Sequence, residues 1–204
     1  MIVSTWRHGL TVSDAKSDRM QIPTEPFVGL FGNWQREGSG TPWRADAARR
    51  FTREGFAWFD PTQSGWTGID ESNGDALQSR IDALVAHEQE ALTRCACAVM
   101  YIVTPPLRPD GTAPETPLAS RVELGELVQM VTPTFVFLGA DVKGRNYLRA
   151  VIARAPHVTL CNSLDDALGR AADHLRHAGL TLRDDTPTDH FARGLRASLP
   201  ESRL

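Results

Sequence analysis

The sequence has few cysteines and little net charge. Three of its 204 residues are cysteine, so they cannot all pair. Each lies in or beside an apolar run, where a buried free thiol is the usual occupant. The Cys95-x-Cys97 spacing lacks the further ligands of a zinc site, so we expect no metal. Lysine and arginine number 22 against 25 acidic residues. No run of like charge is long enough to follow a phosphate backbone, and we expect no polymeric nucleic acid as a partner.

Long apolar runs are also missing. The longest are strand-sized, such as Ala98 to Val103 and Thr134 to Leu138, whereas a membrane helix needs about 20 apolar residues. Met1 to Leu10 lacks the basic start, apolar run and small-residue cleavage site of a secretory signal. With 41% hydrophobic and 23% charged residues, the composition is that of a folded protein. We therefore expect a cytoplasmic protein with no membrane contact.

Short apolar runs alternate with helical patterns along the chain. The strand-like runs are Phe27 to Phe31, Phe56 to Phe59, Ala98 to Val103, Thr134 to Leu138 and Val158 to Cys161. The helical patterns are Trp43 to Glu54, Ala76 to Arg94, Ser120 to Met130, Gly144 to Ala155 and Leu164 to His177. This alternation predicts a doubly wound α/β domain over 27–180, with a five-stranded parallel sheet in the order 2-1-3-4-5. Residues 1–26 form an N-terminal extension and 181–204 a C-terminal tail.

The strand order predicts where a ligand binds. In such a sheet the switch point lies between the first and third strands, and ligands bind at their carboxyl ends. Gly32, Asn33 and Trp34 follow the first strand, Asp60 the second, and Thr104 the third. For Asp60, a turn made through its own side chain is favoured over a catalytic role.

The loop after the first strand has the ingredients of a phosphate cradle. It contains Gly38-Ser39-Gly40 and leads to a helix N-terminus, with Arg44 as an ion partner. It matches neither a G-x-G-x-x-G nor a Walker pattern. Trp34, Trp43 and Trp66 flank the same edge, either as core residues or as stacking surfaces for a flat base.

Two glutamates are candidates for chemistry. Glu123 lies one turn into the helix after the third strand, where a helix N-terminus favours the ionised form that a nucleophile needs. The alternative is a structural capping box with Ser120. Glu88 falls between Leu84 and Leu92 on an apolar helix face, while Glu90 points away. A carboxyl on such a face is desolvated, paired or placed at a cleft. The alternative for Glu88 is a place at the rim, or a pair with an arginine.

Together these motifs resemble a known family. They are Phe31-Gly32-Asn33, Trp43-Arg44, Phe59-Asp60-Pro61, Trp66, Glu88, Ser120-x-x-Glu123-x-Gly125 and Ser163-Leu164-Asp165-Asp166-Ala167-Leu168. In this order, over Phe27 to Ala172, the chain is similar to the nucleoside 2-deoxyribosyltransferase-like superfamily, which includes nucleotide N-glycosidases.

The resemblance implies a flavodoxin-like fold and a reaction. Members cleave the bond between a nucleobase and C1′ of the sugar, in a nucleoside or a nucleoside 5′-monophosphate. The resemblance places the nucleophile at Glu123 and a sugar- or base-binding acid at Glu88, or less well at Glu90. It implies no cofactor, and a homo-oligomer, dimer or higher, because members complete their sites across subunits. The substrate-binding set becomes Gly32, Asn33, Trp34, Ser39, Arg44, Asp60, Trp66, Thr104 and Ser120.

Two positions depart from the transferases of that superfamily. Leu30 stands where they carry a tyrosine, and Pro117 where they carry an aspartate, with Asp110 or Glu115 as substitutes for the lost acid. Hydrolysis is therefore expected ahead of transfer to a second base. Two other hypotheses stay open: a module that senses a nucleotide in the same cleft without turnover, and an interaction protein that works through its extensions.

Overall fold

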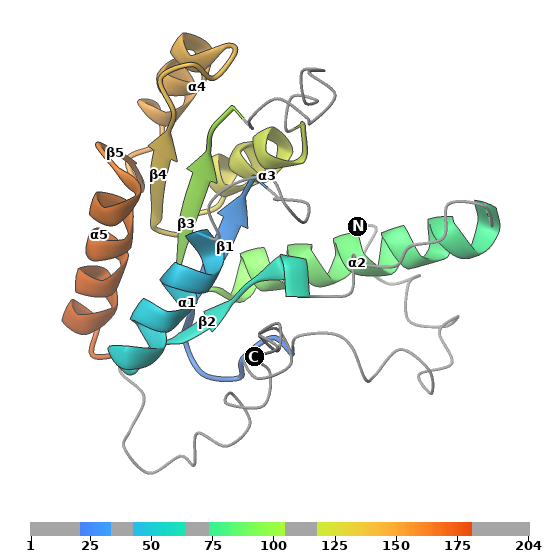
Figure 1. The fold of residues 1–204 in the computed structure, drawn as a ribbon, viewed down its shortest axis with the longest axis horizontal. Helices are drawn as coiled ribbons and strands as arrows, with labels where there is room; N and C mark the ends of the chain where they lie inside the picture. Colours follow the sequence, from blue (N-terminus) through green and yellow to red (C-terminus); the bar gives the residue numbers. More distant parts are fainter. Residues whose placement is uncertain (1–20, 34–42, 64–73, 105–117, 181–204) are drawn as a thin grey trace, which may run out of the picture.

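The computed structural model describes residues 21–33, 43–63, 74–104 and 118–180. Their elements, in chain order, are β1 (Phe27–Gly32), α1 (Trp43–Arg53), β2 (Ala57–Phe59), η1 (Pro61–Gln63), α2 (Gly74–Arg94), β3 (Cys97–Ile102), α3 (Leu118–Gln129), β4 (Thr134–Leu138), α4 (Arg145–Ile152), β5 (Val158–Cys161) and α5 (Leu164–His177). The strands form one sheet in the order β2-β1-β3-β4-β5, with every neighbouring pair parallel (Figure 1). The predicted doubly wound α/β fold is confirmed.

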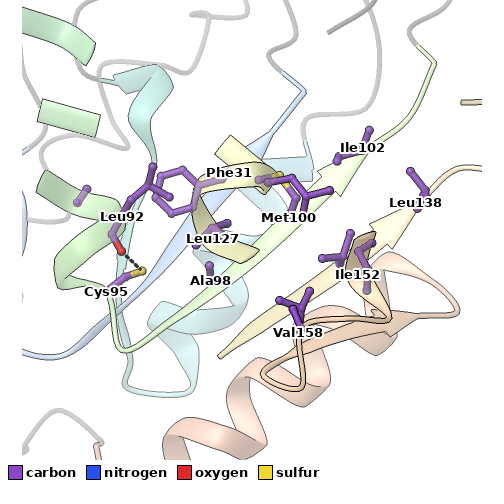
Figure 2. Close-up of a cluster of buried hydrophobic side chains, with 14 of the residues drawn as sticks. Phe31, Leu92, Cys95, Ala98, Met100, Ile102, Leu127, Leu138, Ile152 and Val158 are labelled. Carbon is purple, nitrogen blue, oxygen red and sulfur yellow. Dashed lines mark hydrogen bonds between the residues drawn. The ribbon is translucent and has the colours of Figure 1, made fainter. Parts of the chain in front are cut away.

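Helices cover both faces of the sheet. Because side chains alternate along a strand, Phe27 and Phe31 of β1 pack on one face with α2, α3 and α4. Val28 and Leu30 pack on the other face with α1 and α5. Figure 2 shows part of the first cluster, in which Phe31 and Met100 lie beside Leu92 of α2 and Leu127 of α3. Burial on both faces explains why the strands are almost continuously apolar.

Capping residues and glycines mark the boundaries of several helices at the positions that the sequence predicts. The hydroxyl of Ser163 accepts a hydrogen bond from the Asp166 N–H at 3.0 Å and caps α5. Gly55, just after α1, has φ +76°, the left-handed conformation that glycine adopts without strain. At the end of α4 the prediction was too long. The helix stops at Ile152 instead of Ala155, because the residue before Pro156 is disfavoured in the helical conformation.

The start of α3 also differs from the prediction, and this difference bears on the candidate site. The helix begins at Leu118 instead of Ser120. Ser120 therefore lies inside the first turn, and Glu123 lies in the second.

Part of the predicted N-terminal extension belongs to the folded body. Ile22 packs against the core cluster shown in Figure 2, and the buried Pro23 accepts a hydrogen bond at its carbonyl from Arg94 Nη2 at 2.8 Å. Residues 1–20 and the tail 181–204 lie outside the described residues. Across the described ranges, no helix is both long enough and apolar enough to span a membrane.

Candidate active site

Gly32 ends β1 and brings it into contact with α3. Its φ is +109°, and a Cβ there would lie 2.2 Å from the carbonyl oxygen of Tyr101 on β3. No other residue fits this position without a shift of the backbone. The Gly32 N–H donates to Glu123 Oε2 at 3.1 Å. The strand end therefore fixes the carboxyl of Glu123 at the switch point of the sheet.

Glu123 is half-buried and has an unusual acidity. Its pKa is raised from the ordinary 4.5 to about 7, chiefly by burial and next by the negative charge of Glu88. The Arg44 charge and the Gly32 N–H act in the opposite direction, and Glu126 adds a smaller upward shift. At neutral pH the carboxyl is therefore divided between its ionised and protonated forms.

Two sequence-based interpretations of Glu123 need correction. The helix N-terminus does not hold it fully ionised, because burial and the charge of Glu88 raise its pKa and because the residue lies in the second turn of α3, beyond the turn where the helix dipole acts most strongly. The capping box with Ser120 is wrong as well. Ser120 is a buried residue inside the first turn of α3, and Oε2 of Glu123 is bonded to Gly32, which is 91 residues away in the chain.

Glu88 lies on α2 between the buried Leu84 and Leu92 and is itself half-buried. Its charge acts on both Glu123 and Arg44. By contrast, Glu90 is exposed and pairs with Arg94 at 2.9 Å. The prediction from helical periodicity, with Glu88 inward and Glu90 outward, is confirmed.

Arg44 is the buried cation of the site. Its guanidinium donates to the carbonyl oxygens of Gly32 and Asn33, each at 2.7 Å, and to that of Leu30 at 3.3 Å. Burial lowers its pKa, while the charges of Asp60, Glu123 and Glu88 oppose that shift. Because its nitrogens bind the end of β1, Arg44 acts here as the residue that positions the strand end. Its predicted part as a phosphate partner stays a prediction.

Asp60 follows β2 and joins the same network. Its Oδ1 lies 3.3 Å from Arg44 Nε and accepts hydrogen bonds from the N–H and hydroxyl of Thr62, at 2.9 and 2.7 Å. This is the side-chain turn that the sequence favours for Asp60. The carboxylate thus closes the turn after β2 and balances the charge of Arg44.

Asn33 and Trp43 complete the inner surface of this edge. The Asn33 N–H donates to the Tyr101 carbonyl at 2.8 Å, and its side-chain nitrogen donates to the Val103 carbonyl. Trp43 is 1% exposed, and its ring packs 5.1 Å from that of Tyr101. Of the two interpretations for Trp43, the core residue is the one observed.

Six of the predicted site residues meet through these contacts and charges: Gly32, Asn33, Arg44, Asp60, Glu88 and Glu123. Thr104 is exposed just beyond β3. Trp34, Ser39 and Trp66 lie outside the described residues. Where the chain is described, no group of three or more histidine, cysteine, aspartate or glutamate residues is arranged to hold a metal ion.

Sequence reasoning missed the contact between Gly32 and Glu123, and it missed the carbonyls of Tyr101 and Val103 as anchors for Asn33. The one signal for the first contact is the glycine at the end of a buried strand, which indicates a close approach of backbone. No sequence signal identifies the partner across 91 residues.

The arrangement supplies a carboxyl of raised pKa, a second carboxyl close enough to influence it, and a buried cation that stabilises negative charge. Paired carboxyls in different environments are the means by which proteins perform acid–base and nucleophilic chemistry on glycosidic bonds. No model of a known protein family matches the chain, and no curated protein sequence matches it either. The superfamily resemblance therefore stays a prediction from the motifs.

Proposed function

We propose that the protein cleaves the N-glycosidic bond of a nucleoside or nucleoside 5′-monophosphate, with Glu123 as the nucleophile. The observation that carries the proposal is the placement of the Glu123 carboxyl. It is half-buried at the switch point, held by the Gly32 N–H, and flanked by the charges of Glu88 and Arg44. Ligands of doubly wound sheets bind at this point.

The reaction proceeds in two displacements. A carboxylate oxygen of Glu123 attacks C1′, and the C1′–N bond breaks with its electron pair leaving on the base, which takes up a proton. The sugar is then held as an ester of Glu123. Water attacks C1′ of the ester, passes its proton to Glu88 or to solvent, and frees the carboxylate. Glu88 either orients the sugar hydroxyls or delivers the proton to the base.

The raised pKa of Glu123 gives the proposal a pH signature. Below pH 7 the carboxyl is mostly protonated, and the neutral acid is a much poorer nucleophile toward C1′ than the carboxylate. The rate kcat/KM should therefore fall as the pH drops through about 7. If Glu123 instead served as the acid that protonates the base, kcat/KM would rise as the pH falls through the same range.

The substrate class follows the superfamily resemblance and is part of the proposal. Hydrolysis is proposed ahead of transfer, because the transferase residues are replaced by Leu30 and Pro117. A homo-oligomer is proposed on the same grounds, and a cytoplasmic location is proposed from the sequence pattern, in which Met1 to Leu10 lacks the features of a secretory signal. The predicted phosphate loop around Ser39 lies outside the described residues, so a requirement for the 5′-phosphate rests on the sequence pattern alone.

The test is a panel of nucleosides and nucleoside monophosphates, with and without a second base, with released base measured by chromatography. Wild-type protein should release base from some members of the panel. Glu123→Gln should lose at least about a thousandfold in rate, as expected for removal of a nucleophile, and Glu88→Gln should lose less. Glu90→Gln is the matched control on α2, because its side chain is exposed and pairs only with Arg94 among the contacts described. It should keep wild-type activity.

Two outcomes contradict the proposal. Base release by Glu123→Gln at the wild-type rate removes the nucleophile. Tight binding of a nucleotide by the wild-type protein with no release over hours favours the sensing module instead.

A further inference from the structure

Asn33 spans the two strands that flank the switch point. Its backbone follows β1 directly, while both of its donated hydrogen bonds end on β3 or just after it. The backbone N–H binds the Tyr101 carbonyl at 2.8 Å, and the side-chain nitrogen binds the Val103 carbonyl. The Arg44 guanidinium holds the carbonyl of Asn33 at 2.7 Å. The side chain is therefore fixed at the point of the sheet where a ligand is expected.

The side-chain oxygen of Asn33 has no hydrogen-bond partner among the described residues. Asn33 is 2% exposed, and its Oδ1 is buried without a donor from that part of the chain. The orientation of the amide follows from its contact, because only the nitrogen can donate to the Val103 carbonyl. A buried acceptor without a donor is costly, and native proteins keep few of them. A ligand that brings a hydrogen-bond donor would satisfy this oxygen.

The residue before Asn33 indicates which part of a ligand would donate a hydrogen bond to Oδ1. The preceding residue, Gly32, binds the Glu123 carboxyl, so the amide lies beside the group that attacks the anomeric carbon in the proposed function. Three atoms are bonded to that carbon in a nucleoside besides hydrogen: the ring oxygen, the base nitrogen and C2′. The ring oxygen only accepts, and the base nitrogen leaves. Only C2′ can carry a donor, its hydroxyl.

We propose that Asn33 Oδ1 accepts a hydrogen bond from the 2′-hydroxyl of the substrate, so that the protein selects ribonucleosides or ribonucleotides over their 2′-deoxy counterparts. This inference rests on the proposed function, because the position of C1′ is set by Glu123. Oδ1 is covered in the free protein, so the proposal requires that ligand binding expose this atom.

The first test needs no change at Asn33. Glu123→Gln keeps the ligand intact, and four nucleosides with one base are compared by calorimetry: 2′-hydroxyl, 2′-hydrogen, 2′-fluoro and 2′-amino. The hydroxyl and amino forms donate, whereas the fluoro form does not. We expect the two donors to bind at least about tenfold more tightly than the other two, the ratio that one well-made hydrogen bond supplies. Equal affinity for all four, or a fluoro form that binds as tightly as the hydroxyl form, overturns the proposal.

A second test removes the acceptor. Asn33→Leu in the Glu123→Gln background should bring the ratio of ribo to deoxyribo affinity close to one, with thermal unfolding measured in parallel. The control is Trp43→Phe. This change removes the indole nitrogen, a second buried polar atom that has no hydrogen-bond partner among the described residues. The indole ring lies 4.7 Å from the guanidinium of Arg44. The control variant should keep the preference. Loss of the ribose preference in both variants overturns the proposal that Asn33 itself recognises the 2′-hydroxyl. If Asn33→Leu does not fold, the comparison of the four ligands decides.

The two proposals fail in different ways. Base release by the wild-type protein without a preference for the 2′-hydroxyl overturns this inference and leaves the glycosidase intact. Preferential binding of the 2′-hydroxyl ligand without base release from any ligand overturns the glycosidase proposal. It leaves a site that recognises ribose without cleaving the ligand. Absence of binding by all four ligands overturns both.

Discussion

The two ends of the sheet differ in what they bury. Among the described residues, the buried polar or charged side chains are Asn33, Arg44, Asp60, Ser120 and Thr134, and the first four belong to β1, β2, α1 and α3 or to the turns beside them. At the other end, α5 packs on β3 and β4 through alanines and leucines. Its ion pair between Arg176 and Asp173 is exposed. Burial of charge is costly, so the position of the buried ion pair of Arg44 with Asp60 supports a candidate site at the β2–β1 end of the sheet, with the α5 side as scaffold.

The largest contrast is expected between two arginines. Arg44→Met removes the buried cation, its contact with Asp60 at 3.3 Å and its hydrogen bonds to the end of β1, which should cost about 3–5 kcal/mol in the free energy of unfolding. Arg176→Gln breaks an exposed pair with Asp173 on α5 and a pair with the half-buried Glu54, and it should cost about 1 kcal/mol or less. Denaturant unfolding of both proteins measures the difference. Similar costs for the two would contradict the division into site and scaffold.

Two glycines, one at the candidate site and one inside α5, allow a second comparison of the same two regions. Gly32→Ala forces a Cβ toward the Tyr101 carbonyl at φ +109° and should destabilise the fold by roughly 2–4 kcal/mol. Gly169→Ala, inside α5, meets only Arg50 Nη2 at 3.6 Å and should stabilise the fold by about 0.5–1 kcal/mol through helix propensity. Thermal and denaturant unfolding decide the signs. A gain in stability for Gly32→Ala would show that the strand end is not fixed as described.

The carboxyl of Glu123 should itself reduce stability at alkaline pH. Its pKa in the folded state, about 7, exceeds the ordinary 4.5, so between these values the folded state binds more protons than the unfolded state. Stability therefore declines as the pH rises through that window. Since one pKa unit is worth about 1.4 kcal/mol, Glu123→Gln should be more stable than wild type by roughly 1–3 kcal/mol at pH 8. Near pH 4 the gain should vanish, and a gain independent of pH would contradict the assigned pKa.

The smallest expected effect is a shift in a pH profile. Because the charge of Glu88 raises the pKa of Glu123, Glu88→Gln should move the acidic limb of kcat/KM to lower pH. Glu90→Gln should leave that limb in place, because Glu90 is not among the causes of the shift. The pH profiles of kcat/KM for both variants can be measured from relative rates alone. An unchanged limb in Glu88→Gln would mean that the two carboxyls do not act as a pair.

The sequence predicted the fold and part of the site because these depend on local patterns. Alternating apolar runs and helices lead to the parallel sheet, and helical periodicity separates Glu88 from Glu90. The acidity of Glu123 could not be predicted in this way. It results from burial and from charges on α1 and α2, which the fold brings together.

Arg44 teaches the same lesson. Its position at the start of a helix after a glycine-rich loop predicts a partner for phosphate, and that prediction stays untested. The sequence does not predict that its guanidinium holds the carbonyls at the end of β1, because this contact forms between two elements. Residues that act within one element could thus be predicted, whereas residues whose part is set between elements could not.

The central claim is that Glu123 forms a bond with the sugar. The most direct measurement is acid quenching of the wild-type protein during turnover of a nucleoside that it cleaves, followed by peptide mass mapping. The account predicts a peptide containing Glu123 that is heavier by one sugar residue, and no such peptide from Glu123→Gln. A sugar adduct on another residue, together with undiminished base release by Glu123→Gln, would contradict it.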